Sequence, residues 1–293
     1  MSVTGLLNGL ITSFTETEKE MVSVERAYQF ESIEPENWVG LEQVSSNWPN
    51  EPVIEFIDVV LQYKEDGINA LNGISFKINA GEKIGVCGRT GSGKSSLFMA
   101  LFRGEEIKSG LIKIDDVNIR NMSLNNLRES MSIIPQDPFL FDGTLRENLD
   151  PSNENDDSKL WDVLQKCRLD TKFKSDPAGL DLKIEKKGKN LSSGEKQLVC
   201  LARAMLTNRK ILCIDEATAS VCFEGDHFIQ QTIRDEFVNF TVLTIAHRIE
   251  TILDYDRILV LDKGKLIEFD TPKNLLSNGS TIFYSLFDSN KNQ

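Results

Sequence analysis

The chain has 293 residues, of which 40% are hydrophobic and 27% are charged, a composition that argues against disordered and fibrous proteins. Its formal net charge of −12 argues against broad, non-specific binding of nucleic acid, because such binding needs a basic surface. The five cysteines form no CxxC pair, which argues against a disulfide framework or a zinc site and favours a reduced, cytosolic setting.

The start of the chain, residues 1–30, is predicted to form a helix. Thr15 and Glu18 have the spacing of a capping box, in which two side chains bond the free backbone N–H groups at a helix start. One apolar face can be formed by Met21, Val24 and Tyr28. No apolar run in the chain reaches the length of a membrane span.

Residues 31–52 are predicted to be a linker, because they contain three prolines and several Asn and Ser residues. A compact domain is predicted from residue 53 to residue 289, and its polar, helical segment 143–192 is predicted to be an inserted helical subdomain. Strands alternate with helical patterns in this domain, which indicates an α/β protein with a largely parallel sheet. The predicted strands are residues 53–63, 74–78, 83–88, 211–215 and 242–246.

A glycine-rich loop between an apolar strand and a helix is the strongest single motif. It matches G-x-x-x-x-G-K-[ST] and reads Gly88-Arg89-Thr90-Gly91-Ser92-Gly93-Lys94-Ser95. The glycines let backbone N–H groups point at phosphate oxygens, and the following helix aims its positive end at the same place. Lys94 can reach the outer phosphates, and the Ser95 hydroxyl can hold Mg²⁺. The alternative, a turn in an ordinary βα unit, is disfavoured because both flanking elements fit a nucleotide-binding loop.

Two carboxylates, Asp215 and Glu216, end an apolar strand, which is costly unless they are exposed or paired with a cation. Beside a phosphate-binding loop, Asp215 fits as a Mg²⁺ partner through water, and Glu216 fits as the base that deprotonates the attacking water. Without that loop, two solvated acids would be the favoured interpretation. His247 follows another predicted strand, where it could bond the γ-phosphate, although a lone histidine there is more often structural.

The segment that decides the class is Leu191-Ser192-Ser193-Gly194-Glu195-Lys196-Gln197. It resembles the ABC signature LSGGQ, with Ser193 and Glu195 as departures, and alone it could also be a helix N-cap, at Ser192 or Ser193, followed by Glu195. It occurs in order with the phosphate loop, Gln136 in IIPQDP, ILCIDEAT and TIAHR. This combination resembles the nucleotide-binding domains of the ABC transporter family.

The resemblance covers nearly the whole chain and is to the second nucleotide-binding domain of the multidrug-resistance-associated (C) subfamily. It implies an α/β P-loop NTPase core of the ABC type, with an antiparallel β subdomain and an inserted helical subdomain. It also implies ATP hydrolysis that powers export of organic anions or drug-like substrates at the cytoplasmic face of a membrane. Residues 1–30 resemble the end of the last transmembrane helix and the helix that leaves it.

The resemblance further implies roles for individual residues. Residues 88–96, which end in Ser96, would bind ATP, and Tyr63 would stack on the adenine ring unless it is a core aromatic of its strand. Ser95, Gln136 and Asp215 would hold Mg²⁺. Catalysis would involve Lys94, Gln136, Glu216 and His247.

Two partners are implied as well. Ser193 and Gly194 would contact ATP held by the first nucleotide-binding domain of the same transporter, packed head to tail. Gln136 would couple the site to transmembrane domains through their intracellular loops. A glutamate at position 216 favours the second, hydrolytic domain over the first.

Two departures from the family pattern stand out. Cys222 replaces the usual aspartate of the loop after the acidic pair, which puts coupling between the two ATP sites in doubt. Residues 185–189 are basic instead of acidic, which indicates either a solvated face or a changed contact with the intracellular loops. Two rival functions remain: a soluble ABC ATPase acting on DNA or ribosomes, which the acidic charge disfavours, and a non-enzymatic nucleotide-binding regulator.

Overall fold

The computed structural model describes residues 2–33, 36, 40, 42, 44–45, 47–64, 67–207, 209–215, 223–246 and 248–291. Contacts divide the chain into two units, Met1–Trp38 and Val39–Gln293. The second unit therefore begins before residue 53. The end of the predicted linker is bonded to that unit, since Lys210 Nζ donates to the Pro49 carbonyl at 2.9 Å and Thr241 Oγ1 donates to the Pro52 carbonyl at 2.8 Å.

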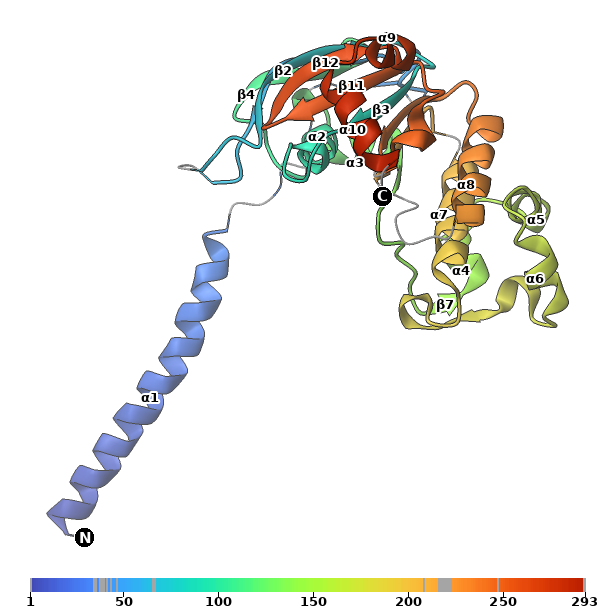
Figure 1. The fold of residues 1–293 in the computed structure, drawn as a ribbon. Helices are drawn as coiled ribbons and strands as arrows, with labels where there is room; N and C mark the ends of the chain where they lie inside the picture. The colour runs from blue at the N-terminus through green and yellow to red at the C-terminus, as the bar shows by residue number, and fades with distance from the viewer. Residues whose placement is uncertain are drawn as a thin grey trace. The chain divides into compact units, whose positions relative to one another are not determined.

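Helix α1 (Val3–Glu31) makes up most of the first unit (Figure 1). The predicted capping box at Thr15 is wrong, because Thr15 lies inside the helix and its hydroxyl donates to the Ile11 carbonyl at 2.9 Å. The helix begins instead at Ser2, whose hydroxyl accepts a bond from the Gly5 N–H at 3.3 Å. No described residue of α1 is buried. No helix in the described ranges is both long enough and apolar enough to cross a membrane.

Two sheets form the centre of the second unit. The antiparallel sheet has the order β2-β1-β4-β5 and consists of β1 (Ile54–Leu61), β2 (Leu71–Ile78), β4 (Ser109–Ile114) and β5 (Val117–Asn118). The larger sheet has the order β12-β11-β3-β10-β9-β6 and is parallel except for β12 at its edge. Its strands are β3 (Lys83–Cys87), β6 (Met131–Ile134), β9 (Ile211–Asp215), β10 (Thr241–Ile245), β11 (Arg257–Asp262) and β12 (Lys265–Asp270).

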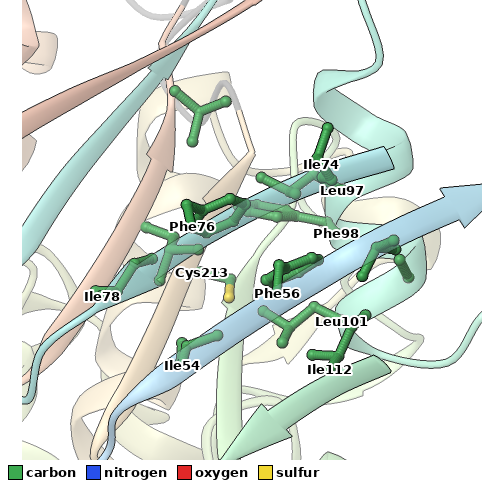
Figure 2. Close-up of a cluster of buried hydrophobic side chains, with 14 of the residues drawn as sticks. Ile54, Phe56, Ile74, Phe76, Ile78, Leu97, Phe98, Leu101, Ile112 and Cys213 are labelled. Atoms are coloured by element: carbon green, nitrogen blue, oxygen red, sulfur yellow. The ribbon is translucent and has the colours of Figure 1, made fainter. Parts of the chain in front are cut away.

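The main core joins both sheets to helix α2 (Lys94–Leu101), as Figure 2 shows for its labelled side chains. Phe56 and Phe76 stack with ring centroids 4.5 Å apart, and Phe98 and Leu101 of α2 belong to the same buried cluster. Burying large apolar side chains of this kind contributes roughly 1.5–3 kcal/mol each. The core therefore fixes the start of α2, where the glycine-rich loop ends.

A second core packs the segment predicted to be a helical subdomain against α7 (Ser193–Thr207), α8 (Phe223–Glu236) and strands of the larger sheet. This segment contains β7 (Gly143–Thr144), α4 (Leu145–Leu149), α5 (Asp157–Lys166), α6 (Asp170–Ser175) and β8 (Lys183–Ile184). Helix α7 follows it and contacts α4, α5 and β6. The remaining α-helices of the described residues are α3 (Leu124–Glu129), α9 (Pro272–Ser277) and α10 (Ile282–Lys291). The predicted α/β class, with an antiparallel sheet and a helical insertion, is confirmed.

Candidate nucleotide-binding site

The predicted site residues follow neighbouring parallel strands of the larger sheet. The glycine-rich loop follows β3, Asp215 ends β9, and Gln136 lies two residues beyond the end of β6. Strand β10 lies between β3 and β9, and its last residue, Ile245, pairs with Asp215. Because the carboxyl ends of parallel strands meet at one edge of the sheet, these segments leave the same edge, where α/β proteins bind their ligands. Glu216 and His247 lie outside the described residues, so their roles stay predictions.

The glycine-rich loop depends on backbone shapes that other residues rarely adopt. Gly88, Gly91 and Gly93 have φ angles of 151°, 77° and 106°. A Cβ on Gly88 would lie 2.3 Å from the Leu261 carbonyl oxygen, and one on Gly93 would lie 2.7 Å from the Ala70 carbonyl oxygen. At Gly91 it would meet no heavy atom of the described residues within 4 Å. Two glycines therefore seat the loop against the fold, while the third leaves space where it faces outward.

Polar groups of the loop suit an anionic ligand. Lys94 Nζ donates to the carbonyl oxygens of Gly88 at 2.9 Å and Arg89 at 3.3 Å, so its charge is held over the loop. Ser92 is 3% exposed, and its Oγ has no hydrogen-bond partner among the described residues. A buried hydroxyl without a partner costs roughly 1–3 kcal/mol, which identifies the loop as a place where polar contacts are incomplete. Such loops bind phosphate through backbone N–H groups and the start of the next helix.

Tyr63 lies beside the start of α2 and not in the core. Its side chain is 50% exposed, and its hydroxyl donates to Ser96 Oγ at 3.0 Å. The alternative that Tyr63 is a core aromatic of its strand is therefore wrong. An aromatic ring that is half exposed and anchored through its hydroxyl is able to offer a face to a planar ligand.

Oxygen donors at the sheet edge fit Mg²⁺. Ser95 and Gln136 are exposed and Asp215 is half-buried. The described part of the chain holds no group of three His, Cys, Asp or Glu side chains that could bind a metal alone. Mg²⁺ does not need such a group, because it usually takes one or two protein oxygens together with water and phosphate oxygens.

The predicted signature segment forms the start of α7. The Ser192 hydroxyl accepts a bond from the Glu195 N–H at 3.3 Å, and the Ser192 N–H donates to Glu195 Oε2 at 2.8 Å. These reciprocal bonds are a capping box, so the helix N-cap that the sequence left open is present at Ser192. Ser193 and Gly194 are half-buried at the positive end of this 15-residue helix, a position that favours anions.

The departure at Glu195 has a structural reason. Glu195 closes the capping box and also pairs with Lys172 of α6, with 2.7 Å between Oε1 and Nζ. Partial burial alone would raise the pKa of Glu195, but the hydrogen bonds from Lys172 and Ser192 outweigh it and hold the pKa below its usual range. A glutamate here thus joins the signature turn to the helical insertion.

Sequence reasoning missed two side chains of α7. Gln197 is 1% exposed, and its Nε2 donates to the carbonyl oxygens of Pro135 at 3.3 Å and Gln136 at 2.9 Å. Arg203 donates to the Phe139 carbonyl at 2.6 Å and to Asn148 Oδ1 at 2.9 Å. Gln197 could have been suspected, because it lies one helical turn after Ser193 on the same face.

A third missed feature is an ion pair beside the predicted catalytic histidine. Asp226 of α8 is 3% exposed, and its Oδ2 lies 3.0 Å from Arg248 NH1. Arg248 directly follows position 247 in the chain. The pair therefore ties α8 to the segment that carries His247.

Comparison with known proteins identifies the class that this fold and site define. Residues 71–219 match the model of the family described as ABC transporter, which is about half of the chain. The chain belongs to the ABC transporter family. A solved structure, "Structure of a bacterial Atm1-family ABC exporter with ATP bound", is similar to 93% of this chain with a TM-score of 0.81 and 29% identity, over 47% of its own length.

Individual relatives narrow the class to one subfamily. ATP-binding cassette sub-family C member 10 of Mus musculus is 47% identical over 99% of this chain, and ABC transporter C family member 3 of Dictyostelium discoideum is 49% identical over 95% of it. The chain is an ATP-binding domain of ABC transporter sub-family C, and domains of this type are ATPases. It spans about a fifth of the length of these two relatives (20% of each).

Proposed function

We propose that the chain binds and hydrolyses ATP as the second nucleotide-binding domain of an ABC exporter of the multidrug-resistance-associated type. The observation that carries the proposal is the glycine-rich loop with Lys94 held over it, at the same sheet edge as Asp215. Residues 88–96 would hold the phosphates, and Tyr63 would stack on adenine. A phosphate oxygen would replace the two carbonyls that Lys94 now contacts, because an ammonium bonds a charged oxygen more strongly than a neutral one.

Mg²⁺ is proposed as the metal, held by Ser95, Gln136 and Asp215. When bound, it would neutralise charge on the phosphates. Glu216 would orient and deprotonate the attacking water, and His247 would bond the γ-phosphate. Glu216 would then be the base that makes this domain hydrolytic.

The proposed partner across the ATP is the first nucleotide-binding domain of the same transporter. Ser193 and Gly194 lie at the start of α7 and are partly exposed to solvent. The capping box between Ser192 and Glu195 holds this start in place. A helix start facing a second nucleotide would complete an ATP sandwich in which each domain supplies the signature for the other. ATP would close the pair and hydrolysis would reopen it.

The transmembrane domains are the second proposed partner. A groove of about 430 Å³ lies beside β6 and α7, close to Gln136, and its lining includes Phe139 and Ile133, which are 64% and 45% exposed. Exposed apolar groups in a groove favour a docking segment, which we propose is an intracellular loop of the transmembrane domains. The protein would then act at the cytoplasmic face of a membrane and export organic anions or drug-like substrates.

Helix α1 supports the same connection. Apolar side chains recur along it at spacings of four and three residues, with one interval of seven between Phe14 and Met21, which is the pattern of a helix that packs on other helices. All of them are exposed: Val3, Leu7, Leu10, Phe14, Met21, Val24 and Tyr28. We propose that residues 1–30 extend from the last transmembrane helix, and that 31–52 link it to the domain 53–289 with its helical subdomain 143–192. The opening segment resembles that of multidrug-resistance-associated protein 7.

The test is Glu216→Gln in the chain assembled with the first nucleotide-binding domain. ATP binding should persist, while phosphate release should fall by at least about 100-fold, because a positioned general base contributes that much or more. Glu51→Gln, at an exposed position, is the matched control and should leave both unchanged. Normal phosphate release by Glu216→Gln would exclude the assigned role. ATPase activity that rises with added DNA would instead favour the rival soluble ATPase.

A further inference from the structure

A buried amide joins the signature helix to the loop that carries Gln136. Gln197 is 1% exposed, and its Nε2 donates to both backbone carbonyls of the dipeptide Pro135–Gln136, at 3.3 Å and 2.9 Å. The bonds cross 62 and 61 positions of sequence. They hold the backbone at Gln136, whose side chain is exposed, and the backbone sets the direction in which that side chain leaves the loop.

The acceptor end of the Gln197 amide differs from its donor end. Gln197 Oε1 is buried and has no hydrogen-bond partner within the described ranges. An orphaned buried acceptor costs roughly 1–3 kcal/mol, which an apolar side chain of similar shape would avoid. An apolar side chain would therefore serve the stability of the core at least as well as this amide. Only the amide can hold the loop at Pro135–Gln136 through hydrogen bonds.

The position of Gln197 along α7 connects two parts of the proposed site. Ser193 opens the helix, and Gln197 lies four residues later, so both fall on one face a single turn apart. The first turn is itself fixed by the Ser192–Glu195 capping box. A displacement of this turn would therefore move the Gln197 amide and, with it, the backbone of Gln136.

We infer that Gln197 is a positioning residue for Gln136: it orients the Gln136 side chain toward the nucleotide-bound Mg²⁺ and links that orientation to the signature turn. The inference rests on the proposed function, in which Gln136 contacts Mg²⁺. Gln197 itself touches neither metal nor nucleotide in this scheme. Its effect should appear in the Mg²⁺ dependence of nucleotide binding and not in the affinity for nucleotide without metal.

The experiment measures binding of a fluorescent ATP analogue to the full 293-residue chain, with Mg²⁺ and with EDTA. The variants are Gln197→Met, which keeps the shape and removes both bonds, and Gln197→Asn, which shortens the amide beyond reach of the two carbonyls. In each variant, the ratio of the affinity with Mg²⁺ to the affinity in EDTA should be about fivefold smaller than in the wild type, as expected for hydrogen bonds of roughly 1 kcal/mol. Affinity in EDTA should not change. Gln165→Met, at an exposed position of α5, is the matched control and should match the wild type.

A double variant separates positioning from a general loss of structure. Gln136→Ala should lose part of the Mg²⁺ gain, since Ser95 and Asp215 remain, and Gln136→Ala with Gln197→Met should lose no more than Gln136→Ala alone, because the Gln197 change acts through Gln136. Additive losses, or an unchanged Mg²⁺ gain in Gln197→Met when Gln136→Ala has reduced it, would overturn the inference alone. A wild-type chain whose nucleotide binding gains nothing from Mg²⁺ would instead overturn the proposed metal site, and the inference with it.

Hydrogen exchange on the wild-type chain gives a readout that needs no variant to fold. Adding Mg²⁺ and nucleotide should protect amides of residues 136–141 and of the first turns of α7 together, since Gln197 connects them. Protection of the loop with unchanged exchange at residues 196–200 would contradict the link.

Discussion

The glycine-rich loop and the signature helix are built by opposite means. The loop is shaped by its backbone: two glycines press against carbonyl oxygens of neighbouring strands and loops, and the main core holds α2 directly behind them. Helix α7 is held by side chains, namely the Ser192–Glu195 box at its start and, further along, the Gln197 amide and the Arg203 guanidinium. The first arrangement leaves no room for a side chain at Gly88 or Gly93. The second can lose its bonds one at a time.

Gly88→Ala should produce the largest effect, because it changes the glycine-rich loop, whose shape depends on its backbone. The new Cβ would lie 2.3 Å from the Leu261 carbonyl, at a residue whose φ is 151°. We expect a loss of about 3 kcal/mol in the free energy of unfolding, measured by urea denaturation, together with loss of nucleotide binding.

Gly91→Ala is the matched control for that substitution. Its φ of 77° carries a left-handed strain of about 1 kcal/mol, but its Cβ would point into open space. Equal destabilisation by the two substitutions would show that close contact with the fold does not shape this loop.

Arg203→Met should have the next largest effect, on the half built by side chains. It removes the donors to the carbonyl oxygens of Phe139 and Asn148 and one of the two donors to Asn148 Oδ1, which keeps the bond from the Phe141 N–H. Because Asn148 is fully buried, losing these bonds should lower the free energy of unfolding by about 2 kcal/mol. Arg120→Met, which removes an exposed arginine paired with Glu106 at 3.5 Å, should change it by less than about 0.5 kcal/mol. A larger effect of Arg120→Met would reverse our ranking of the two arginines.

The same contrast decides what the sequence could predict. The glycine-rich loop is a local pattern, since its glycines, lysine and serine lie within eight positions and each spacing has a physical meaning. The tethers of α7 are not local: Gln197 meets Gln136 across 61 positions, and Arg203 meets Asn148 across 55. No periodicity or short motif reports such a pair. The burial of the Gln197 amide therefore emerged only from the packing of α7 on β6.

Two smaller outcomes have the same cause. The Thr15–Glu18 spacing predicted a helix start, but no proline precedes it, so α1 continues through it and the Thr15 hydroxyl bonds the preceding turn. The Tyr63 ring had two possible environments, and only the arrangement of β1 against α2 showed that it is half exposed. Local spacing is informative where a contact joins residues that are close in sequence, and it is ambiguous where the contact is made by a segment far away in sequence.

The smallest expected effect concerns Glu195 and is visible in the pH dependence of stability. Glu195→Ala removes a capping-box partner and the contact with Lys172, and should lower the free energy of unfolding by about 1 kcal/mol at pH 7. Glu195→Gln keeps an oxygen for the Ser192 N–H and loses only the charge, so it should cost about half as much.

The sign of the pH effect follows from the direction of the pKa shift. The pKa of Glu195 is held below its ordinary value of 4.5 in the folded state by Lys172 and Ser192, against the opposing effect of burial. Its contribution is therefore present above pH 4.5 and is lost as the pH falls through the folded-state pKa. Urea denaturation at pH 7 and at pH 3 should show the difference between wild type and Glu195→Gln shrinking at the lower pH. A difference that stays constant between the two would mean that the Glu195 charge does not hold the signature turn.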